Sequence, residues 1–239
     1  MITATLLITT SMLASALTAA TGVGGGTLLL LVMVWILPLP VAIPLHSAVQ
    51  LFSNGSRAWL IREHIRHKII VPILIGGCFG SVIGVPLILG ETVTNWLPVI
   101  FGTLVLVVVW LPLPAINHLT PSKLLCLGLF INGIGSLISA IGPITASTLR
   151  TQMDNRLQTV ATLAAVVCGF GVARVFTYTA NGFLWGQWLE LLAGMLISGY
   201  VGTRLGLHWL NKLSEDLFSI TFKLVLTGMA LAIIARALM

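Results

Sequence analysis

The sequence predicts an all-α, polytopic membrane protein built from two inverted-topology repeats. Its composition excludes an ordinary soluble domain, because 57% of the 239 residues are hydrophobic and only 8% are charged. A soluble domain carries roughly 25% charged residues, so this chain has too few polar side chains to cover a surface that faces water. Each spanning helix needs about 20 apolar residues, which leaves room for roughly six to nine of them.

Apolar segments follow one another along the whole chain, and short polar or Gly/Pro-containing stretches separate them. Such stretches are typical of helix ends and turns. We therefore predict helices over residues 2–20, 27–37, 41–61, 69–89, 96–111, 124–141, 144–149, 157–180, 187–210 and 217–238.

Two interruptions lie inside apolar sequence with no charge beside them: the glycine-rich stretch 22–26, and Gly142-Pro143. The segment 27–37 that follows the first would be about 16 Å long at 1.5 Å per residue, roughly half the hydrocarbon core. Irregular backbone at membrane depth survives only where it is buried in protein or lines a wet cavity. We therefore predict, at each interruption, a broken helix whose second piece turns back near the midplane.

The order of a broken pair followed by three transmembrane helices occurs twice, which predicts repeats over residues 1–114 and 115–239 within one transmembrane domain. Small residues spaced by four, which let helices approach closely, occur at the same place in both repeats, at Gly76, Gly80 and Gly84 and at Ser198, Gly202 and Gly206. If a broken pair makes no net crossing, each repeat crosses three times and the second is inverted. Inverted repeats with broken helices indicate a secondary transporter.

The basic residues predict the orientation. If residues 62–68 are cytoplasmic, then Lys123, Arg150, Arg156 and Lys212 fall on the same side, and the opposite loops contain no Lys or Arg. This distribution follows the positive-inside rule. It predicts a multi-pass protein of the cytoplasmic (inner) membrane, surrounded by the lipid bilayer, with both termini outside.

The sequence shows no sign of other partners or cofactors. The net charge of +6 comes without a basic run with interleaved aromatics, so we expect no nucleic-acid partner. The three cysteines lie in apolar segments without metal-ligand or disulfide spacing, so we expect no metal and no cofactor.

Each interruption leaves a helix N-terminus inside the membrane. Such an end presents free N–H donors and about half a positive charge, so two of them facing each other would form an anion site. The residues assigned to the two ends are Gly22, Gly24, Gly25, Gly26 and Thr27, and Gly142, Pro143, Ile144 and Thr145. The alternative is that each break is only a kink or a packing feature.

Polar side chains add to this site from two helices. A stripe with helical spacing follows segment 41–61, and the matching helix 157–180 contributes further polar residues: His46, Gln50, Asn54 and Arg57, and Thr159, Thr162 and Arg174. All six acidic residues are predicted at loops or helix ends, so the embedded charges are basic, which favours an anion over a cation. Interhelical hydrogen bonding, or snorkelling of Arg57 to the headgroups, is the alternative.

At these residues the chain resembles the TauE/SafE sulfite exporter family of membrane permeases. The matching stretches cover nearly the whole chain and include residues 22–26, 44–57 (PLHSAVQLFSNGSR), Gly80 and Gly84, Gly142-Pro143, 159–162 and Arg174. The resemblance implies transport of small sulfur-containing anions such as sulfite and organosulfonates.

Residues and resemblance together predict a secondary transporter that moves a small, sulfur-containing oxyanion by alternating access. An anion channel of the same fold is the alternative. The sequence has no HExxH, no embedded aspartate pair and no Ser/His arrangement, so we predict no enzyme and no catalytic residues. The loops are short, which argues against a scaffold for soluble partners. The exact substrate, its direction, a coupling ion and the oligomeric state, including a homodimer, stay open.

Overall fold

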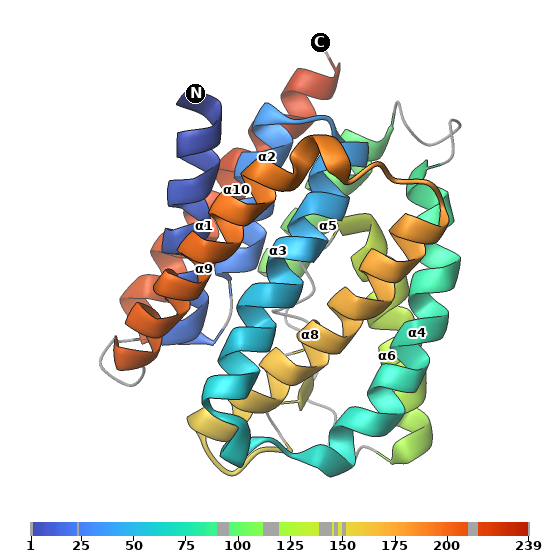
Figure 1. Ribbon diagram of the computed structural model, residues 1–239, viewed down its shortest axis with the longest axis vertical. Coiled ribbons are helices and arrows are strands. Elements are labelled where there is room, and N and C mark those ends of the chain that lie inside the picture. The colour runs from blue at the N-terminus through green and yellow to red at the C-terminus, as the bar shows by residue number, and fades with distance from the viewer. Residues whose placement is uncertain are drawn as a thin grey trace.

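The computed structural model of the chain describes residues 2–22, 24–89, 96–111, 120–138, 145, 148–149, 152–209 and 215–238 (Figure 1). Within these ranges the fold is all-helical, as predicted. The helices are α1 (Ile2–Thr21), α2 (Gly25–Ile36), α3 (Leu39–Leu60), α4 (His67–Leu89), α5 (Leu97–Trp110), α6 (Pro121–Ile138), α8 (Arg156–Ala180), α9 (Leu189–Trp209) and α10 (Glu215–Leu238), with short 3-10 helices η1 (Arg62–His64) and η2 (Gly186–Trp188). The predicted segment 144–149 falls largely outside the described residues.

Length and composition make three of the described helices able to cross a membrane: Ile2–Thr21, His67–Pro86 and Arg156–Ala180. Helix α3 is as long, at 22 residues, but its polar stripe lowers its hydropathy. Large apolar side chains are exposed on the outside of the bundle, among them Leu13, Phe79, Phe130, Phe176, Ile197 and Leu231. An apolar exterior of this extent indicates contact with lipid rather than water.

The tryptophans mark the ends of the helices. All seven lie at or near a helix terminus, namely Trp35, Trp59, Trp96, Trp110, Trp185, Trp188 and Trp209. Tryptophan is enriched where a membrane meets water, because its ring is apolar and its N–H is polar. The distribution therefore agrees with helices whose ends lie near the two membrane surfaces.

Helices α1 and α2 are separated at the predicted glycine-rich stretch, whereas a break near the membrane midplane stays a prediction. Gly22 and Gly24 have φ angles of 93° and 102°, a left-handed conformation that favours glycine and lets the chain reverse. Helix α2 then folds back along α1, and a Cβ on Gly25 would lie only 1.9 Å from the carbonyl oxygen of Ala14. The first turn of α2 lies beside the middle of α3, where His46 contacts the carbonyl of Gly26.

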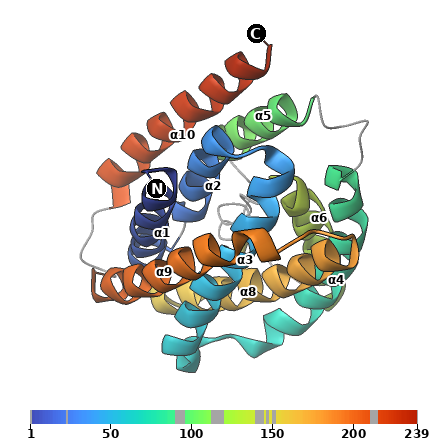
Figure 2. The ribbon, with the colours of Figure 1, turned by 45° about the horizontal axis from the view of Figure 1, so that its top comes forward.

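Helices from the two halves of the chain pack against each other. Helix α1 packs along α9, α4 along α6, α3 along α8, and α5 along α10. In Figure 1, α4 and α6 form one side of the bundle, α1, α9 and α10 form the other, and α3 and α8 lie between them. Figure 2 shows α3 surrounded by α2, α8 and α9.

Small residues bring α4 very close to α6. A Cβ on Gly76 would lie 1.9 Å from the carbonyl oxygen of Leu125, and a Cβ on Gly80 would lie 2.4 Å from that of Leu129. No side chain could occupy either place without moving the neighbouring backbone. The close approach predicted from the spacing of small residues is confirmed for this helix.

The corresponding stripe on α9 packs on α1 in the same way. A Cβ on Gly202 would lie 2.0 Å from the carbonyl oxygen of Met12. One turn earlier, the Ser198 hydroxyl donates a hydrogen bond of 2.9 Å to the carbonyl of Ile8. The predicted close approach is therefore confirmed for α9 as well.

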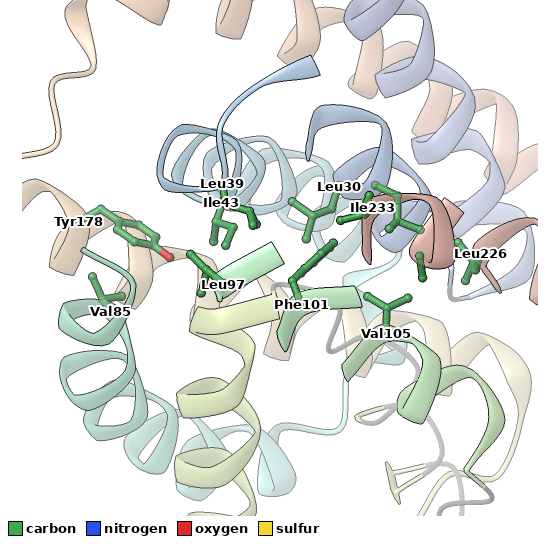
Figure 3. Close-up of a cluster of buried hydrophobic side chains, with 12 residues drawn as sticks. Leu30, Leu39, Ile43, Val85, Leu97, Phe101, Val105, Tyr178, Leu226 and Ile233 are labelled. Atoms are coloured by element: carbon green, nitrogen blue, oxygen red, sulfur yellow. The ribbon is translucent and has the colours of Figure 1, made fainter. Parts of the chain in front are cut away.

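A hydrophobic cluster joins α5 and α10 to α2 and α3 (Figure 3). Its buried members include Leu30, Leu39, Ile43, Val85, Leu97, Phe101, Val105, Tyr178, Leu226 and Ile233. Burying this many apolar side chains fixes the short helix α2 against its neighbours. Figure 1 places both chain ends at one end of the bundle, and the prediction that this end lies outside the cell stays a prediction.

Candidate functional site

The predicted polar stripe on α3 lies inside the protein. Its members His46, Gln50, Asn54 and Arg57 are all buried. On the opposite side of the same helix, Phe52 and Trp59 are exposed, as expected for a lipid-facing surface. The stripe therefore faces the neighbouring helices, which are α2, α8 and α9.

Three of these side chains form a hydrogen-bonded relay. The Asn54 Nδ2 donates to both the Gln50 carbonyl oxygen and Gln50 Oε1, at 2.8 Å each. Arg57 Nη1 donates to Asn54 Oδ1 at 3.0 Å. A carbonyl only accepts and a guanidinium only donates, so the orientation of both amides is fixed.

Within the relay the side-chain oxygens are already bonded, so the groups that remain available for a ligand are N–H donors. Both side-chain oxygens, on Gln50 and Asn54, accept bonds from within the relay. Gln50 Nε2 makes no hydrogen bond to an acceptor among the described residues, and Arg57 Nε and Nη2 are buried without a hydrogen-bond partner. The Arg57 side chain is 2% exposed. Leaving buried guanidinium N–H groups unsatisfied is costly, which indicates that a ligand or water completes the site.

The start of α2 adjoins the relay. Gly24 is the N-cap and provides no side-chain cap, and the first helical bond runs from Leu28 N–H to the Gly24 carbonyl at 3.1 Å. The N–H groups of Gly25, Gly26 and Thr27 therefore have no acceptor within the helix. A Cβ on Gly26 would lie 3.1 Å from Gln50 Nε2, so the amide of Gln50 packs directly on this helix start.

Glycine is needed at each position of this break for a different structural reason. Gly22 and Gly24 adopt positive φ angles, and Gly25 packs against the backbone of α1. Gly26 is the glycine that lies against the relay. Thr27, the next residue, is also buried. Of the predicted residues in this stretch, Gly26 thus lies nearest to the polar stripe, while the others shape the turn that places it.

Arg174 lies at the level of His46, on the neighbouring helix α8. It is 1% exposed, and its Nη1 donates to the Gly135 carbonyl on α6 at 3.0 Å. His46 Nε2 lies 2.8 Å from the Gly26 carbonyl, and because a carbonyl only accepts, this nitrogen carries the proton. His46 and Arg174 are close enough to interact electrostatically. The structure therefore brings His46, Arg174 and the start of α2 together.

Thr159 and Thr162 lie elsewhere, at the start of α8. The Thr162 hydroxyl accepts a bond of 3.0 Å from the backbone N–H of Arg66, and the Thr159 hydroxyl donates to the Asn155 carbonyl at 3.0 Å. Arg66 also pairs with Asp154. The structure thus places Thr162 at the connection between α3 and α4, whereas the Thr159 hydroxyl bonds within its own helix start, and no hydrogen bond joins either threonine to His46.

The second predicted helix start is largely outside the described residues. Gly142, Pro143 and Ile144 fall there, whereas Thr145 is described and fully buried. The prediction that two helix starts face each other therefore stays a prediction.

The sequence analysis missed polar residues on α6. Asn132 is buried, and its Nδ2 donates to the Gly77 carbonyl at 2.7 Å. Ser136 is buried too, and its carbonyl accepts from the Tyr178 hydroxyl at 3.2 Å. A lone asparagine in an otherwise apolar helix was the available signal for the first of them.

The buried charge of the site is positive. Among the residues whose burial the structure describes, the buried charged side chains are Arg57 and Arg174, and no Asp or Glu is buried with them. The ion pair in the described ranges, between Arg66 and Asp154, is exposed. A buried cation without a carboxylate is strongly unfavourable unless an anion or water compensates it. The arrangement is therefore suited to bind an anion.

Comparison with known protein families gives a match that begins in α1 and ends in α10. The family model described as "Sulfite exporter TauE/SafE" matches residues 7–233. No curated protein and no solved structure matches the chain. The matched range contains the complete α3 relay, the start of α2 and Arg174.

Proposed function

The chain belongs to the sulfite exporter TauE/SafE family of membrane transporters, and from this premise we propose that it moves a small, sulfur-containing oxyanion across the cytoplasmic membrane as a secondary transporter. The substrate class that fits is sulfite or an organosulfonate. The observation that carries the proposal is the buried Arg57 guanidinium, with two nitrogens unpartnered, at the end of a relay that leaves only N–H donors.

A donor-only site favours an oxyanion for two reasons. Sulfite and sulfonate oxygens accept hydrogen bonds, so they can satisfy Gln50 Nε2, the Arg57 nitrogens and the N–H groups at the start of α2. A cation would instead meet the positive end of α2 and a guanidinium, with the carbonyl oxygens of the relay already occupied. Charge and hydrogen-bond polarity therefore both favour an oxyanion over a cation.

The site would extend from Arg57 to Arg174. His46 and Gln50 contact the first turn of α2 near the middle of α3, with Arg174 on the His46 side and Arg57 about two turns beyond Gln50 along α3. An anion crossing the bundle would pass from one guanidinium to the other by way of the helix start. The remaining predicted residues at the second helix start, from Gly142 to Thr145, would complete the site.

We further propose that the two halves are inverted repeats, over residues 1–114 and 115–239, that move against each other. In order along the two halves, the counterparts are α1 and α6, α3 and α8, α4 and α9, and α5 and α10. Exchanging each helix for its counterpart converts the α1–α9 pair into the α6–α4 pair. This agreement supports alternating access by rocking of one repeat against the other.

The contacts within the two pairs support the same relation. Gly84 on α4 packs over the carbonyl of Gly133, and Gly206 on α9 packs over the carbonyl of Ala16, with a Cβ at 2.4 and 2.0 Å from the respective oxygens. Gly84 and Gly206 are the last members of the two small-residue stripes. Equivalent positions thus make equivalent contacts.

The experiment is uptake of radiolabelled sulfite by proteoliposomes that contain the purified chain. Arg57→Gln should reduce the initial rate at least tenfold, because charge-assisted hydrogen bonds contribute about 1.5–3 kcal/mol. The matched control is Arg62→Gln, an exposed arginine in η1, which should leave the rate unchanged. Normal uptake by Arg57→Gln would show that the relay is not the binding site.

Two further measurements refine the assignment. Methanesulfonate should compete with labelled sulfite, whereas dimethyl sulfone, a neutral molecule of similar shape, should not. Unlabelled sulfite inside the vesicles should accelerate uptake if the protein is a carrier. Large ohmic currents without this acceleration would instead identify an anion channel of the same fold.

A further inference from the structure

A cavity of about 360 Å³ lies at the end of the bundle that carries the chain termini, where α2 and α10 end and α3 and α5 begin. Its walls include Val34, Trp35, Pro38, Pro98, Ile233 and Arg236. None of these residues belongs to the α3 relay or to the start of α2. The cavity is therefore a separate feature of the molecule.

The cavity has one cationic corner. Arg236 Nη1 donates to the Trp35 carbonyl at 3.0 Å, and the guanidinium lies 5.7 Å from the centroid of the Trp35 ring. In the part of the chain that the structure describes, the other guanidinium nitrogens of Arg236 make no hydrogen bond. A guanidinium held on one side in this way can present its remaining N–H groups to a phosphate in the bidentate geometry that arginine favours.

The other walls are apolar. Val34, Pro98 and Ile233 offer no charge and no side-chain hydrogen bond. A small oxyanion bound to Arg236 would leave these surfaces uncovered. The cavity therefore fits an amphipathic molecule with a negative group at one end and hydrocarbon at the other.

The surroundings of the cavity indicate a membrane surface. Trp35 and, at the start of α5, Trp96 are exposed, as expected at the level of lipid headgroups. Along α10, Leu231 and Leu238 are exposed on either side of Arg236. A lipid whose headgroup reached Arg236 could therefore keep its acyl chains against an apolar surface.

We propose that this cavity binds the head group of an anionic phospholipid. Its phosphate is bonded to Arg236, and its glycerol and first methylene groups lie against Val34, Pro98 and Ile233. The proposal does not depend on the transported substrate, because the cavity shares no residue with the transport site.

The test is native mass spectrometry of the purified full chain in detergent, with phosphatidylglycerol or phosphatidylcholine added. The wild-type protein should retain phosphatidylglycerol at lower lipid concentrations than phosphatidylcholine. Arg236→Gln should need roughly tenfold more phosphatidylglycerol, as expected from the loss of a charge-assisted bond. Arg236→Lys should lie between the two, because it keeps the charge and loses the fork.

The chain offers a closely matched control. Arg62 Nη1 donates to the Trp59 carbonyl at 3.2 Å, and its guanidinium lies 4.7 Å from the centroid of that ring. Arg62 and Trp59 thus repeat the arrangement of Arg236 and Trp35, but neither of them lines the cavity. Arg62→Gln should therefore bind the lipid as the wild type does.

Several results would overturn the proposal. One is equal binding of the two lipids by the wild type, and another is unchanged binding by Arg236→Gln. An equal loss in Arg62→Gln would show a nonspecific effect of surface charge. Displacement of phosphatidylglycerol by millimolar sulfite would show that the cavity is a mouth of the transport path instead. Thermal unfolding of each variant checks that the fold is retained.

Discussion

Replacing Arg57 by methionine should have opposite effects on stability and on transport. Methionine is long, unbranched and flexible, so it can occupy the space of the arginine stem without a charge. The substitution removes a buried guanidinium that has two unpartnered nitrogens. If Arg57 serves to bind substrate, its unpaired guanidinium destabilises the substrate-free protein. The variant lacks this guanidinium and should therefore be more stable.

The magnitude follows from the contacts of Arg57. The variant loses the Nη1 bond to Asn54 Oδ1, which as a hydrogen bond to a charged group contributes about 1.5–3 kcal/mol. It gains the desolvation free energy of a buried ion, which is several kcal/mol in real proteins. Because Asn54 Oδ1 is left without its donor, we take the loss at its upper value of about 3 kcal/mol. Against a desolvation gain of about 4 kcal/mol, the balance favours the variant by about 1 kcal/mol, which corresponds to a rise of about 2–4 °C in Tm for a chain of this size.

The assay pairs thermal unfolding in detergent, without substrate, with sulfite uptake in proteoliposomes. Arg57→Met should unfold at a higher temperature than the wild type and should not transport. Sulfite should raise the Tm of the wild type and leave that of the variant unchanged, because ligand binding stabilises only a protein that has the site. A variant that unfolds several degrees earlier yet still transports would refute the reasoning and make Arg57 a structural residue.

Three other substitutions test neighbouring parts of the argument. Gln50→Glu places a carboxylate at the start of α2, so it should abolish uptake and raise stability by about 0.5–2 kcal/mol; normal uptake would exclude the helix start as the site. Gly202→Ala should lower the free energy of unfolding by about 1–3 kcal/mol, because the new Cβ would lie 2.0 Å from the Met12 carbonyl oxygen. Gly228→Ala, with open space around it, is its control and should be neutral or stabilising in the same unfolding measurement. Asp154→Asn removes an exposed ion pair with Arg66 and should cost at most about 1 kcal/mol, less at high salt; a larger loss in denaturant titrations would indicate a buried role.

The helices could be predicted from the sequence because glycine, proline and charge separate the apolar segments. The predicted segment 69–89 begins two residues after the start of α4, and 157–180 begins one residue after the start of α8. The start of α2 was predicted two residues late. Gly25 and Gly26 are poor helix formers, and tertiary packing on Ala14 and Gln50 extends the helix through them.

The part of the site that the sequence predicts most directly is the part whose geometry is local. The relay follows from the spacing of Gln50, Asn54 and Arg57 within one helix, and the structure contains it. The partner of Thr162 depends on where the connection after α3 places Arg66, and no pattern in the sequence indicates that position. The packing reason for Gly25 likewise depends on α1, which the spacing of the glycines does not reveal.

The pairing of α1 with α9 and of α4 with α6 has a consequence for biosynthesis. Helix α1 leaves the ribosome early, but the surface against which it packs, around Gly202, is made only near the end of translation. Until then its contact face must be held by lipid, by the insertion machinery or by α2. A stalled or truncated nascent chain that stops before α9 would therefore lack the main native partner of its first helix and should be recognised by membrane quality control.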